Sequence, residues 1–542
     1  MYKYCFQLLC YFYLISQSVC EEIRFNEQSL LNTVDSRFLS VAIDSGVIRR
    51  HWGNFVPDSP TVQLLALALS PCYLRMGGTD ADFLSFQPDN TNHLYGTSLS
   101  QSSNQNDSQY HKYSSSSILN ENMDKNHVTT LHTQNITRDE PLRRSKRDIG
   151  FYGDEKKDLT NFTMSPEFFD EIHQFVTSVS WDLIFDLNVL LRTNDHWNPT
   201  NAMELMNYTI KKGYKMAGWE LGNEPDNYKY LFGNYTLPPW KYVEDFKVFR
   251  KLVKSYPEFS GTFLLGPSVT QPVNKGIVYY KSFLQSGGGD VVTGATFHHY
   301  YINGRTATLD QFYDPTVLNS FGSELVTAVN ITRTLGTKAP IWLGETSSAW
   351  GGGAPGISDR YVAGFMWLDK LGLAARFGVD VVVRQSFYGG HYALLDQHTL
   401  QPNPDYWLSL LYKTLVGQGV LNVTKPESSG TLRVYAHCTN THRSAYPAGS
   451  VTLIVLNVGS SEVKVTLPGV PVTSTLHLYW LTPEEGSLTD QSVSLNGQPL
   501  RVENNKLPDL LIPQKTTAPV NIPALTFGFI VLPDVNLTIC YS

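Results

Sequence analysis

The sequence predicts an α/β protein, a (β/α)8 TIM barrel followed by a C-terminal antiparallel β-sandwich domain. Eight short apolar runs alternate with amphipathic stretches over about the first 400 residues, as barrel strands alternate with helices. After about Asp405, strand-like runs follow one another and are broken by Gly and Pro turns. The chain has 542 residues, 42% of them hydrophobic, which is enough for a barrel and a second domain.

The predicted barrel strands are continuous apolar segments, as expected of strands buried on both faces. In chain order they are Leu39–Asp44, Cys72–Gly78, Leu183–Leu190, Gly218–Glu224, Leu264–Val269, Ala295–Tyr300, Ile341–Thr346 and Val381–Phe387. Amphipathic patterns predict helices at Pro166–Val179, Tyr242–Tyr256, Thr316–Leu335 and Asp359–Phe377. The segment Glu22–Leu31 is a candidate for one more strand beside the first barrel strand. Sandwich strands are predicted at Leu432–Cys438, Val451–Val458, Glu462–Leu467, Leu476–Leu481 and Phe527–Leu532.

A polar segment from about Gly96 to Gly150 interrupts the barrel between its second and third strands. It is rich in Ser, Asn, Gln, His and Thr, so it cannot bury enough apolar area to offset the entropy of ordering. We expect a mobile insert. Near its end lies the basic run Arg143–Arg147, which is either a cleavage site for a processing protease or a solvated charge run. Its place at the edge of the insert favours cleavage.

The first twenty residues indicate the secretory route. Lys3 precedes an apolar stretch, and the small residues Ser18 and Cys20 fit a signal-peptidase site. The alternative is a membrane anchor, but the apolar run is shorter than the roughly 20 residues that a span needs. No later segment has the length and apolarity of a span. We therefore expect a secreted or lysosomal protein without a membrane span.

Sequons and cysteines agree with secretion. Asn-x-Ser/Thr sequons occur at Asn106, Asn135, Asn161, Asn207, Asn234, Asn330, Asn422 and Asn536. If cleavage follows Cys20, three cysteines remain; we pair Cys438 with Cys540 and expect Cys72 to be a buried thiol. No CxxC or HxxxH spacing appears, so neither a metal nor a cofactor is predicted. The net charge of −7 gives no support for a nucleic-acid partner, and a polyanion would have to be held by local basic clusters.

Two glutamates carry the predicted chemistry. The fourth predicted strand ends in Asn223-Glu224-Pro225, and the seventh contains Gly344-Glu345-Thr346. Residues at the C-terminal ends of barrel strands surround the mouth of the barrel, where substrates bind. Retaining glycoside hydrolysis requires two carboxyl groups about 5–5.5 Å apart, one protonated and one ionised. An exposed turn could produce Asn-Glu-Pro by itself, but the pair at these strand ends favours a glycosidase.

The pair resembles the signature of the large clan of retaining barrel glycosidases. The resemblance implies that Glu224 is the acid/base (proton donor), that Glu345 is the nucleophile and that Asn223 binds a sugar hydroxyl. Longer stretches resemble the heparanase family: Gly218–Pro225, His298–Thr306, Trp342–Pro355, Phe365–Leu373, Pro404–Leu411 and His437–Asn440. The similarity runs from about Phe38 to Cys540, apart from the insert.

Membership of that family would imply an endo-β-glucuronidase that acts on the heparan sulfate chains of proteoglycans, in lysosomes and the extracellular matrix. It would also imply a proenzyme that becomes a heterodimer when a processing protease excises a linker. On this basis we expect a signal peptide (1–20), a light chain with the first barrel strands (21–95), an excisable linker (96–156), the rest of the barrel (157–408) and the sandwich (409–542). The substrate contacts implied by the resemblance are Asp44, Thr79, Gln271, His298, Tyr300, Arg305, Trp350, Gly351, Gly352 and Tyr392.

The sequence departs from the family where sulfate would bind. The family's basic clusters are thin here, at Val273–Lys275 and Lys156–Leu159, and Asp80 stands beside Thr79 where the family carries Lys. Gly46 replaces a family Asn. Because sulfate binding is largely electrostatic, we expect weaker affinity or a changed sulfation preference.

Two rival functions stay open at this stage. A non-catalytic heparan-sulfate-binding glycoprotein would use the barrel only as a scaffold, as does a family paralogue that has lost the nucleophile motif; the intact Gly344–Ser348 motif argues against it. An exo-acting uronidase of the same clan would release single uronic acids. The excisable insert disfavours this second alternative because excision suits the unblocking of an open cleft.

Overall fold

The computed structural model describes residues 20–88, 151–152, 155–156, 159–335, 337–424 and 430–541. The predicted signal peptide apart from Cys20, most of the insert, its basic run and the sequons Asn106 and Asn135 lie outside these residues.

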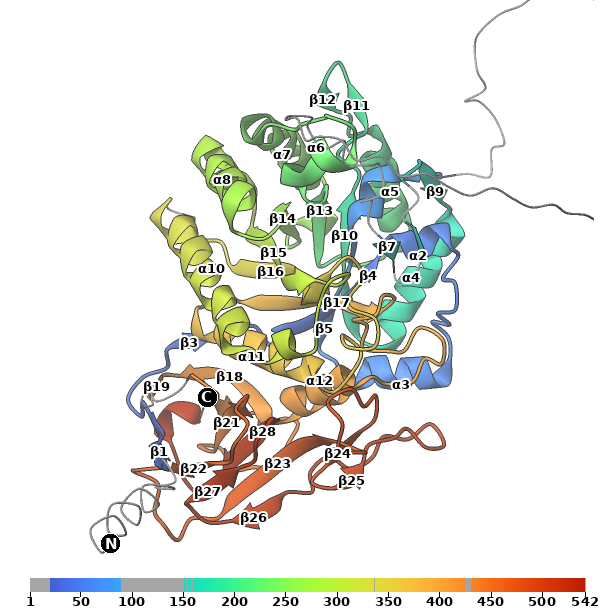
Figure 1. The fold of residues 1–542 in the computed structure, drawn as a ribbon. Coiled ribbons are helices and arrows are strands. Elements are labelled where there is room, and N and C mark those ends of the chain that lie inside the picture. Colours follow the sequence, from blue (N-terminus) through green and yellow to red (C-terminus); the bar gives the residue numbers. More distant parts are fainter. Residues whose placement is uncertain are drawn as a thin grey trace, which may run out of the picture. The chain divides into compact units, whose positions relative to one another are not determined.

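Eight parallel strands close a barrel in the described part of the chain, which confirms the predicted fold class (Figure 1). Their bounds are β4 Leu39–Asp44, β5 Cys72–Gly77, β10 Trp181–Leu187, β13 Gly218–Leu221, β14 Phe263–Val269, β15 Gly294–Asn303, β16 Ile341–Trp350 and β17 Val381–Tyr388. Around the barrel the order is β10-β13-β14-β15-β16-β17-β4-β5. Each predicted barrel strand overlaps one of these eight.

Helices connect successive strands on the outside of the barrel (Figure 1). They include α2 Gly46–Arg49, α3 Pro60–Ala68, α4 Pro166–Ser178, α5 Thr200–Lys212, α6 Tyr228–Leu231, α7 Pro239–Lys254, α8 Asn274–Phe283, α10 Pro315–Thr334 and α11 Ala363–Arg376. The four predicted helices correspond to α4, α7, α10 and α11. Helix α4 begins where Ser165 Oγ accepts a hydrogen bond from Phe168 N at 3.3 Å and Pro166 occupies the first helical position.

Five of these helices, α2, α3, α5, α6 and α8, lie outside the predicted segments, and so does one further helix. Helix α12 (Pro404–Leu415) follows β17 and continues across the predicted domain boundary at 408/409. All of its residues are buried, including Asp405, Ser409 and Lys413, which four-residue spacing places on one face of the helix. The sequence thus carried a helical pattern that was not identified. The expectation of strands alone after about Asp405 was therefore wrong for this segment, and the first strand of the sandwich, β18, begins at Val416.

Two sheets form the sandwich. The larger sheet contains β3 Asn32–Thr33, β18 Val416–Leu421, β20 Leu432–Thr439, β21 Val451–Asn457, β23 Leu476–Pro483, β24 Val493–Leu495, β25 Gln498–Pro499, β26 Gln514–Thr516 and β28 Thr526–Leu532. The smaller contains β1 Cys20–Glu22, β22 Val463–Thr466 and β27 Val520–Ile522. Buried side chains from both sheets, such as Leu453 and Val465, form one apolar core.

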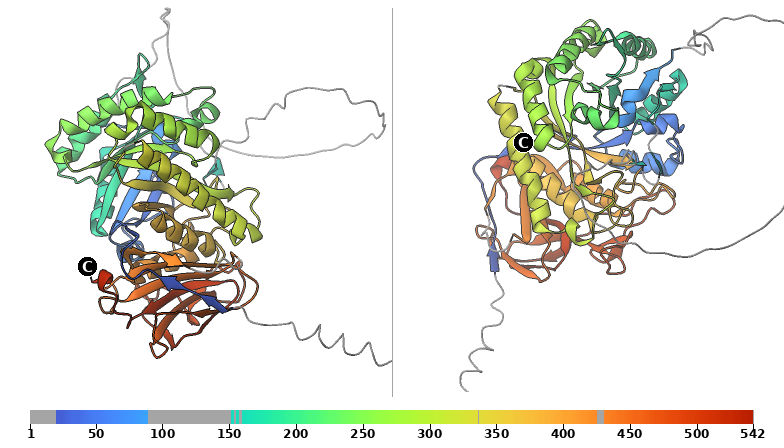
Figure 2. Two further views of the ribbon diagram at one scale, coloured as in Figure 1. Left: turned by 90° about the vertical axis from the view of Figure 1, so that its left-hand side faces the viewer. Right: turned by 45° about the horizontal axis from the view of Figure 1, so that its top comes forward.

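The N-terminal segment belongs to the sandwich and not to the barrel. Strand β1 pairs in parallel with β22, and β3 pairs with β18, so the expectation that Glu22–Leu31 adds a strand beside β4 was wrong. The cause is the fully buried Ile23, which packs into the sandwich core. Figure 2 shows this blue strand among the red strands of the sandwich.

Further predicted features can be placed. Cys438 and Cys540 form a disulfide, and Cys72 is a buried free thiol. The six sequons within the described residues are all exposed: Asn161, Asn207, Asn234, Asn330, Asn422 and Asn536. Within the described ranges, no helix combines the length and apolarity needed to cross a membrane.

A buried ion pair joins the barrel to the sandwich. Asp369 in α11 accepts hydrogen bonds from Arg433 Nη2 at 2.9 Å and from Tyr435 Oη at 2.5 Å, both in β20. Asp369 is fully buried, and the Arg433 side chain is 9% exposed. Arg433 Nη1 also donates to Asn319 Oδ1 in α10 at 2.7 Å.

We expect Asp369→Asn to lower the free energy of unfolding by about 3–5 kcal/mol, because the change leaves the Arg433 charge buried without its counter-ion. Denaturant-induced unfolding measures the difference. The matched control is Asp182→Asn. Its partner Arg37 is partly exposed, so the free energy of unfolding should fall by only about 0–1 kcal/mol. Equal effects of the two variants would contradict the structural role given to Asp369.

Candidate active site

Glu224 reaches the barrel mouth through a tight turn at the end of β13. The strand ends at Leu221, three residues earlier than predicted, because Gly222 adopts a φ of +77°. A Cβ on Gly222 would lie 2.5 Å from Val189 Cγ1, so only glycine fits there. Glu224 itself has a left-handed φ of +52°, and its amide donates to Ser268 O at 2.9 Å. This hydrogen bond to β14 holds the strained residue in place.

Glu345 lies within β16, where the register is irregular on both sides. The pairing shifts at Phe297/His298 toward β15 and at Leu343/Thr346 toward β17. Such irregularities re-aim side chains beside active sites. After the shift, Glu345 pairs with His298, and both side chains are buried.

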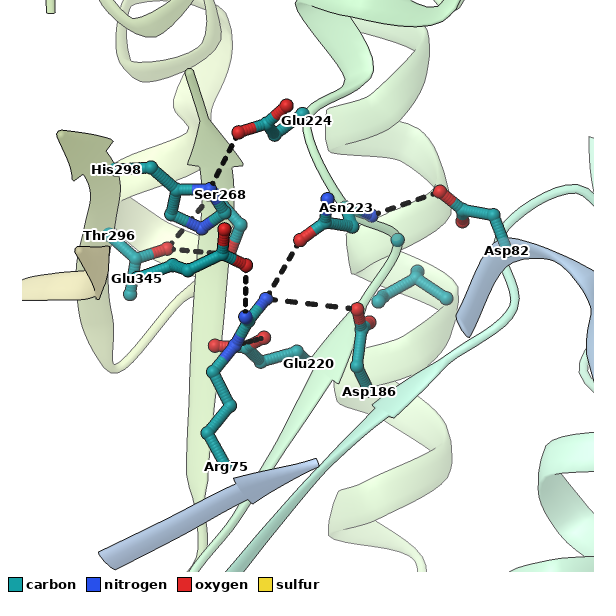
Figure 3. Close-up of polar contacts among 12 residues, drawn as sticks. Arg75, Asp82, Asp186, Glu220, Asn223, Glu224, Ser268, Thr296, His298 and Glu345 are labelled. Atoms are coloured by element: carbon teal, nitrogen blue, oxygen red, sulfur yellow. Dashed lines mark hydrogen bonds and ion pairs between the residues drawn. The ribbon is translucent and has the colours of Figure 1, made fainter. Parts of the chain in front are cut away.

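The structure brings the two predicted glutamates together (Figure 3). One carboxylate oxygen each of Glu224 and Glu345 and one ring nitrogen of His298 lie within 4.8 Å of one another. His298 Nδ1 is 3.0 Å from Glu224 Oε1 and orients that carboxyl group. An approach of this size is of the order of the about 5–5.5 Å between the carboxyl groups of retaining enzymes and is shorter than the about 6.5–9.5 Å of inverting ones.

Both oxygens of Glu345 accept hydrogen bonds. Tyr300 Oη donates to Oε1 at 2.7 Å, and Arg75 Nη1 donates to Oε2 at 2.8 Å. Burial, and after it the charge of Glu345, raises the pKa of Tyr300 well above its usual range, so the phenol keeps its proton and donates it. The two donors favour the ionised form of Glu345 and fix its orientation.

Arg75 was missed by the sequence analysis, although it organises the site. Its Nε donates to Glu220 Oε2 at 2.7 Å and its Nη2 to Asn223 Oδ1 at 2.9 Å (Figure 3). Burial alone lowers the pKa of Arg75, but the charges of Glu220 and after it Glu345 oppose this, and the pKa is raised above its usual range. The available signal was a single arginine inside the otherwise apolar strand β5.

Asn223 owes its orientation to Arg75. Because Arg75 Nη2 binds the Asn223 oxygen, the side-chain NH2 group of Asn223 is left to donate. The backbone N–H of Asn223 donates separately to Asp82 Oδ2 at 3.2 Å. This geometry suits the binding of a sugar hydroxyl expected from the sequence.

Lys370 in α11 is a second residue that the sequence analysis did not identify. Its Nζ donates to Thr346 Oγ1 at 2.7 Å and to Ser347 O at 2.6 Å, on the residues that follow Glu345. Burial lowers the pKa of Lys370 well below its usual range. The buried amine thus supports β16 directly after Glu345.

A second wall of the mouth contains Gly351, Gly352 and Tyr392. Both glycines have positive φ, +84° and +93°, and Gly352 O accepts from His391 N at 2.7 Å. Tyr392 is buried, and its ring stacks near that of Tyr300 with centroids 6.2 Å apart. The structure therefore brings these three predicted residues together beside Glu345.

The other predicted contacts lie around the mouth. The Arg305 guanidinium is 5.9 Å from the ring centroid of Trp350, which is 43% exposed. Gln271 is turned outward, since its Nε2 donates to Glu324 Oε1 at 3.2 Å. Asp44 is buried and accepts from Gly46 N at 2.9 Å, and Thr79 is partly exposed directly after β5.

Among the described residues, one group of three side chains offers suitable donors for a metal ion, namely Glu224, His298 and Glu345. Both Glu345 oxygens already accept hydrogen bonds from Tyr300 and Arg75. The arrangement therefore fits a pair of carboxyl groups engaged in proton transfer and nucleophilic attack. The expectation that no metal is needed stays a prediction.

Comparison with known proteins agrees with this chemistry. Residues 146–372 match the family model of the N-terminal domain of glycosyl hydrolase family 79. The chain is 38% identical over 526 residues to heparanase from Rattus norvegicus, covering 96% of this chain and 94% of that one. It is 33% identical over 534 residues to hyaluronoglucuronidase from Hirudo nipponia, covering 96% and 99%.

A solved structure shows the same fold. The 4-O-α-L-rhamnosyl-β-D-glucuronidase from Fusarium oxysporum 12S superposes with a TM-score of 0.61 at 16% identity, covering 94% of this chain and 100% of that one. With this barrel, the paired glutamates and the full-length similarity to its relatives, the chain belongs to the heparanases and related glucuronidases of glycosyl hydrolase family 79 and is a glycoside hydrolase of the glucuronidase type.

Proposed function

We propose that the protein is an endo-β-glucuronidase that hydrolyses internal glucuronide linkages of heparan sulfate by a retaining double displacement. The observation that carries the mechanism is the approach of the Glu224 and Glu345 carboxyl oxygens to within 4.8 Å, with Glu345 held by Tyr300 and Arg75. The similarity to rat heparanase over 96% of the chain supports the substrate.

In the first step, ionised Glu345 attacks the anomeric carbon and forms a glycosyl ester, while Glu224 gives its proton to the departing glycosidic oxygen. The C–O bond to the leaving sugar breaks as the new bond forms. Tyr300 and Arg75 hold the two oxygens of Glu345, which aligns the attacking oxygen. Asn223 is placed to donate to the hydroxyl beside the reacting carbon.

In the second step, Glu224 takes a proton from water, and that water attacks the anomeric carbon and releases Glu345. Two inversions leave the product with the β configuration of the substrate. As charge returns to the Glu345 carboxylate, the same two donors stabilise it. Since Glu224 must begin the cycle protonated, we expect activity to be highest in mildly acidic conditions.

The uronic acid ring would be recognised by its carboxylate. Gly351 and Gly352 supply backbone amides without a side chain in the way, and Tyr392 supplies a hydroxyl. Burial raises the pKa of Tyr392, so it stays a hydrogen-bond donor. Arg305 and Trp350 would contact a neighbouring sugar.

We further infer that the protein is secreted or lysosomal and is activated by excision of residues near 96–156. Strands β6 (Leu84–Phe86) and β9 (Phe162–Met164) flank the insert and pair in parallel, and β4 and β5 are part of the closed barrel. A light chain ending near residue 95 would therefore stay bound to the heavy chain through two barrel strands after a processing protease has cut.

Glu345→Gln and Glu224→Gln should each abolish shortening of heparan sulfate while the melting temperature stays close to that of the wild type. Gln keeps the shape of the side chain but can neither attack nor transfer the proton. Chain length is measured by size-exclusion chromatography. Glu244→Gln, on the exposed face of α7, is the control and should cut normally. Undiminished cutting by the Glu345 variant would exclude the mechanism. Binding that persists in both variants, with no chain shortening by the processed wild type, would instead favour a binding protein.

Tyr300→Phe should lower kcat roughly 10- to 100-fold with little change in KM, because a hydrogen bond to a charged group contributes about 1.5–3 kcal/mol. Steady-state kinetics test this. Tyr301→Phe is the matched control: the neighbouring Tyr301 packs against Phe321 on the outer side of the strand and should keep its kcat. A large loss in both variants would point to a general disturbance of β15.

Product sizes separate endo from exo cleavage and identify the polymer. We expect oligosaccharides from heparan sulfate and a marked gain in activity after proteolytic processing. Hyaluronan is assayed in parallel, because the leech relative is named for it and the basic clusters are thin. Single uronic acids would favour the exo-acting alternative, and cutting of hyaluronan alone would replace the proposed substrate.

A further inference from the structure

The charges beneath the catalytic pair do not balance. Arg75 faces three carboxyl groups: Glu220 at 2.7 Å, Glu345 at 2.8 Å and Asp186 at 4.0 Å (Figure 3). The side chains of Arg75, Asp186 and Glu220 are at most 1% exposed. If all three acids were ionised, two negative charges would be buried without a counter-ion. Burying such a charge costs on the order of several kcal/mol per ion.

Asp186 is the acid least engaged with the cation. Its Oδ2 lies 4.0 Å from Arg75 Nη2, beyond hydrogen-bond distance, whereas Glu220 and Glu345 each accept a hydrogen bond from Arg75. Neither Asp186 oxygen has a hydrogen-bond partner of normal geometry among the described residues, and the backbone N–H of Gly222, the one donor that acts on it, only partly favours the charged form. An ionised carboxylate in such a place would be strongly disfavoured.

Glu220 makes ionisation of Asp186 harder still. The two residues are register partners on β10 and β13, so they point to the same face of the sheet, inside the barrel. Burial and after it the charge of Glu220 raise the pKa of Asp186 well above its usual range, and Arg75 only partly opposes this.

The remaining titratable groups that act on Asp186 add no positive charge. Asp82, after β5, is itself buried, and burial raises its pKa to about 7. Tyr228 in α6 and Tyr242 in α7 are buried phenols whose pKa values burial raises well above the usual range, so both are neutral. Arg75 is thus the single cation among the groups that face Asp186.

We propose that Asp186 holds a proton in the active enzyme and is a positioning residue, which by staying neutral leaves the Arg75 guanidinium to Glu345 and Asn223. An ionised Asp186 would draw Nη2 away from Asn223 Oδ1 and place a further negative charge near the nucleophile. The proposal rests on the role given to Glu345 above. It predicts that activity is lost as pH rises through the titration of Asp186.

The test uses an aryl β-glucuronide with a good leaving group, because bond breaking then needs little help from the proton of Glu224. Asp186→Asn mimics the neutral acid and should move the alkaline limb of the kcat/KM profile to higher pH, by about one unit or more. Glu220→Gln removes the neighbouring charge and should move the limb to lower pH. Asp182→Asn, on the same strand but paired with Arg37 at the surface, should leave the limb in place. An unshifted limb in Asp186→Asn would overturn the proposal.

Infrared spectroscopy of the wild-type protein gives a measurement that does not depend on turnover or on folding of a variant. At about pH 8 ordinary carboxyl groups are ionised, so the carbonyl band of a protonated carboxyl should persist in the wild type and weaken in Glu220→Gln. A wild-type protein without this band would overturn the proposal. A persistent band in a protein that cleaves no glycoside would instead refute the proposed function and leave the protonation of Asp186 standing.

Discussion

The guanidinium of Arg75 links the parts of the active site to the barrel that carries them. From β5 it reaches Glu220 and Asn223 at the end of β13 and Glu345 on β16, at 2.7, 2.9 and 2.8 Å. A planar fork with several fixed donors can hold three acceptors from different strands at once, which a lysine ammonium does less well. The spacing of Glu345, Asn223 and the loop that carries Glu224 therefore depends on one buried side chain.

Further contacts hold the two glutamates near Arg75 in place. Glu224 occupies a left-handed backbone conformation that a hydrogen bond to Ser268 maintains, and Lys370 braces β16 behind Glu345. Helix α11, which carries Lys370, is also joined to the sandwich through Asp369 and Arg433. The sandwich thus helps to hold the helix that supports β16, which gives the C-terminal domain a part in positioning Glu345.

The recognition surface shows a different balance from the chemistry. Gly351, Gly352 and Tyr392, the residues proposed to bind a uronate carboxylate, lie on one wall of the mouth, where the Tyr392 ring is 6.2 Å from that of Tyr300. Arg49 in α2 lies 3.3 Å from Asp80, so part of the positive charge near this rim is engaged within the protein. Any binding of sulfate groups at this rim would rely on exposed charges, which dissolved salt screens. Cleavage would rely on the buried carboxyl pair, which salt screens much less.

Sequence alone determined the barrel, five of the sandwich strands and the identity of the two glutamates, because periodicity and strand-end motifs are local properties of the chain, and it predicted the Cys438–Cys540 pair. It did not reveal α12, whose polar residues Asp405, Ser409 and Lys413 are buried with the rest, nor the pairing of β1 with β22, which lies more than 400 residues away. Arg75 looked like one polar residue in an apolar strand, and Asp186 like one of two aspartates in β10. Their roles follow from the closed barrel, which buries them together with Glu220. One buried cation then faces more than one buried acid.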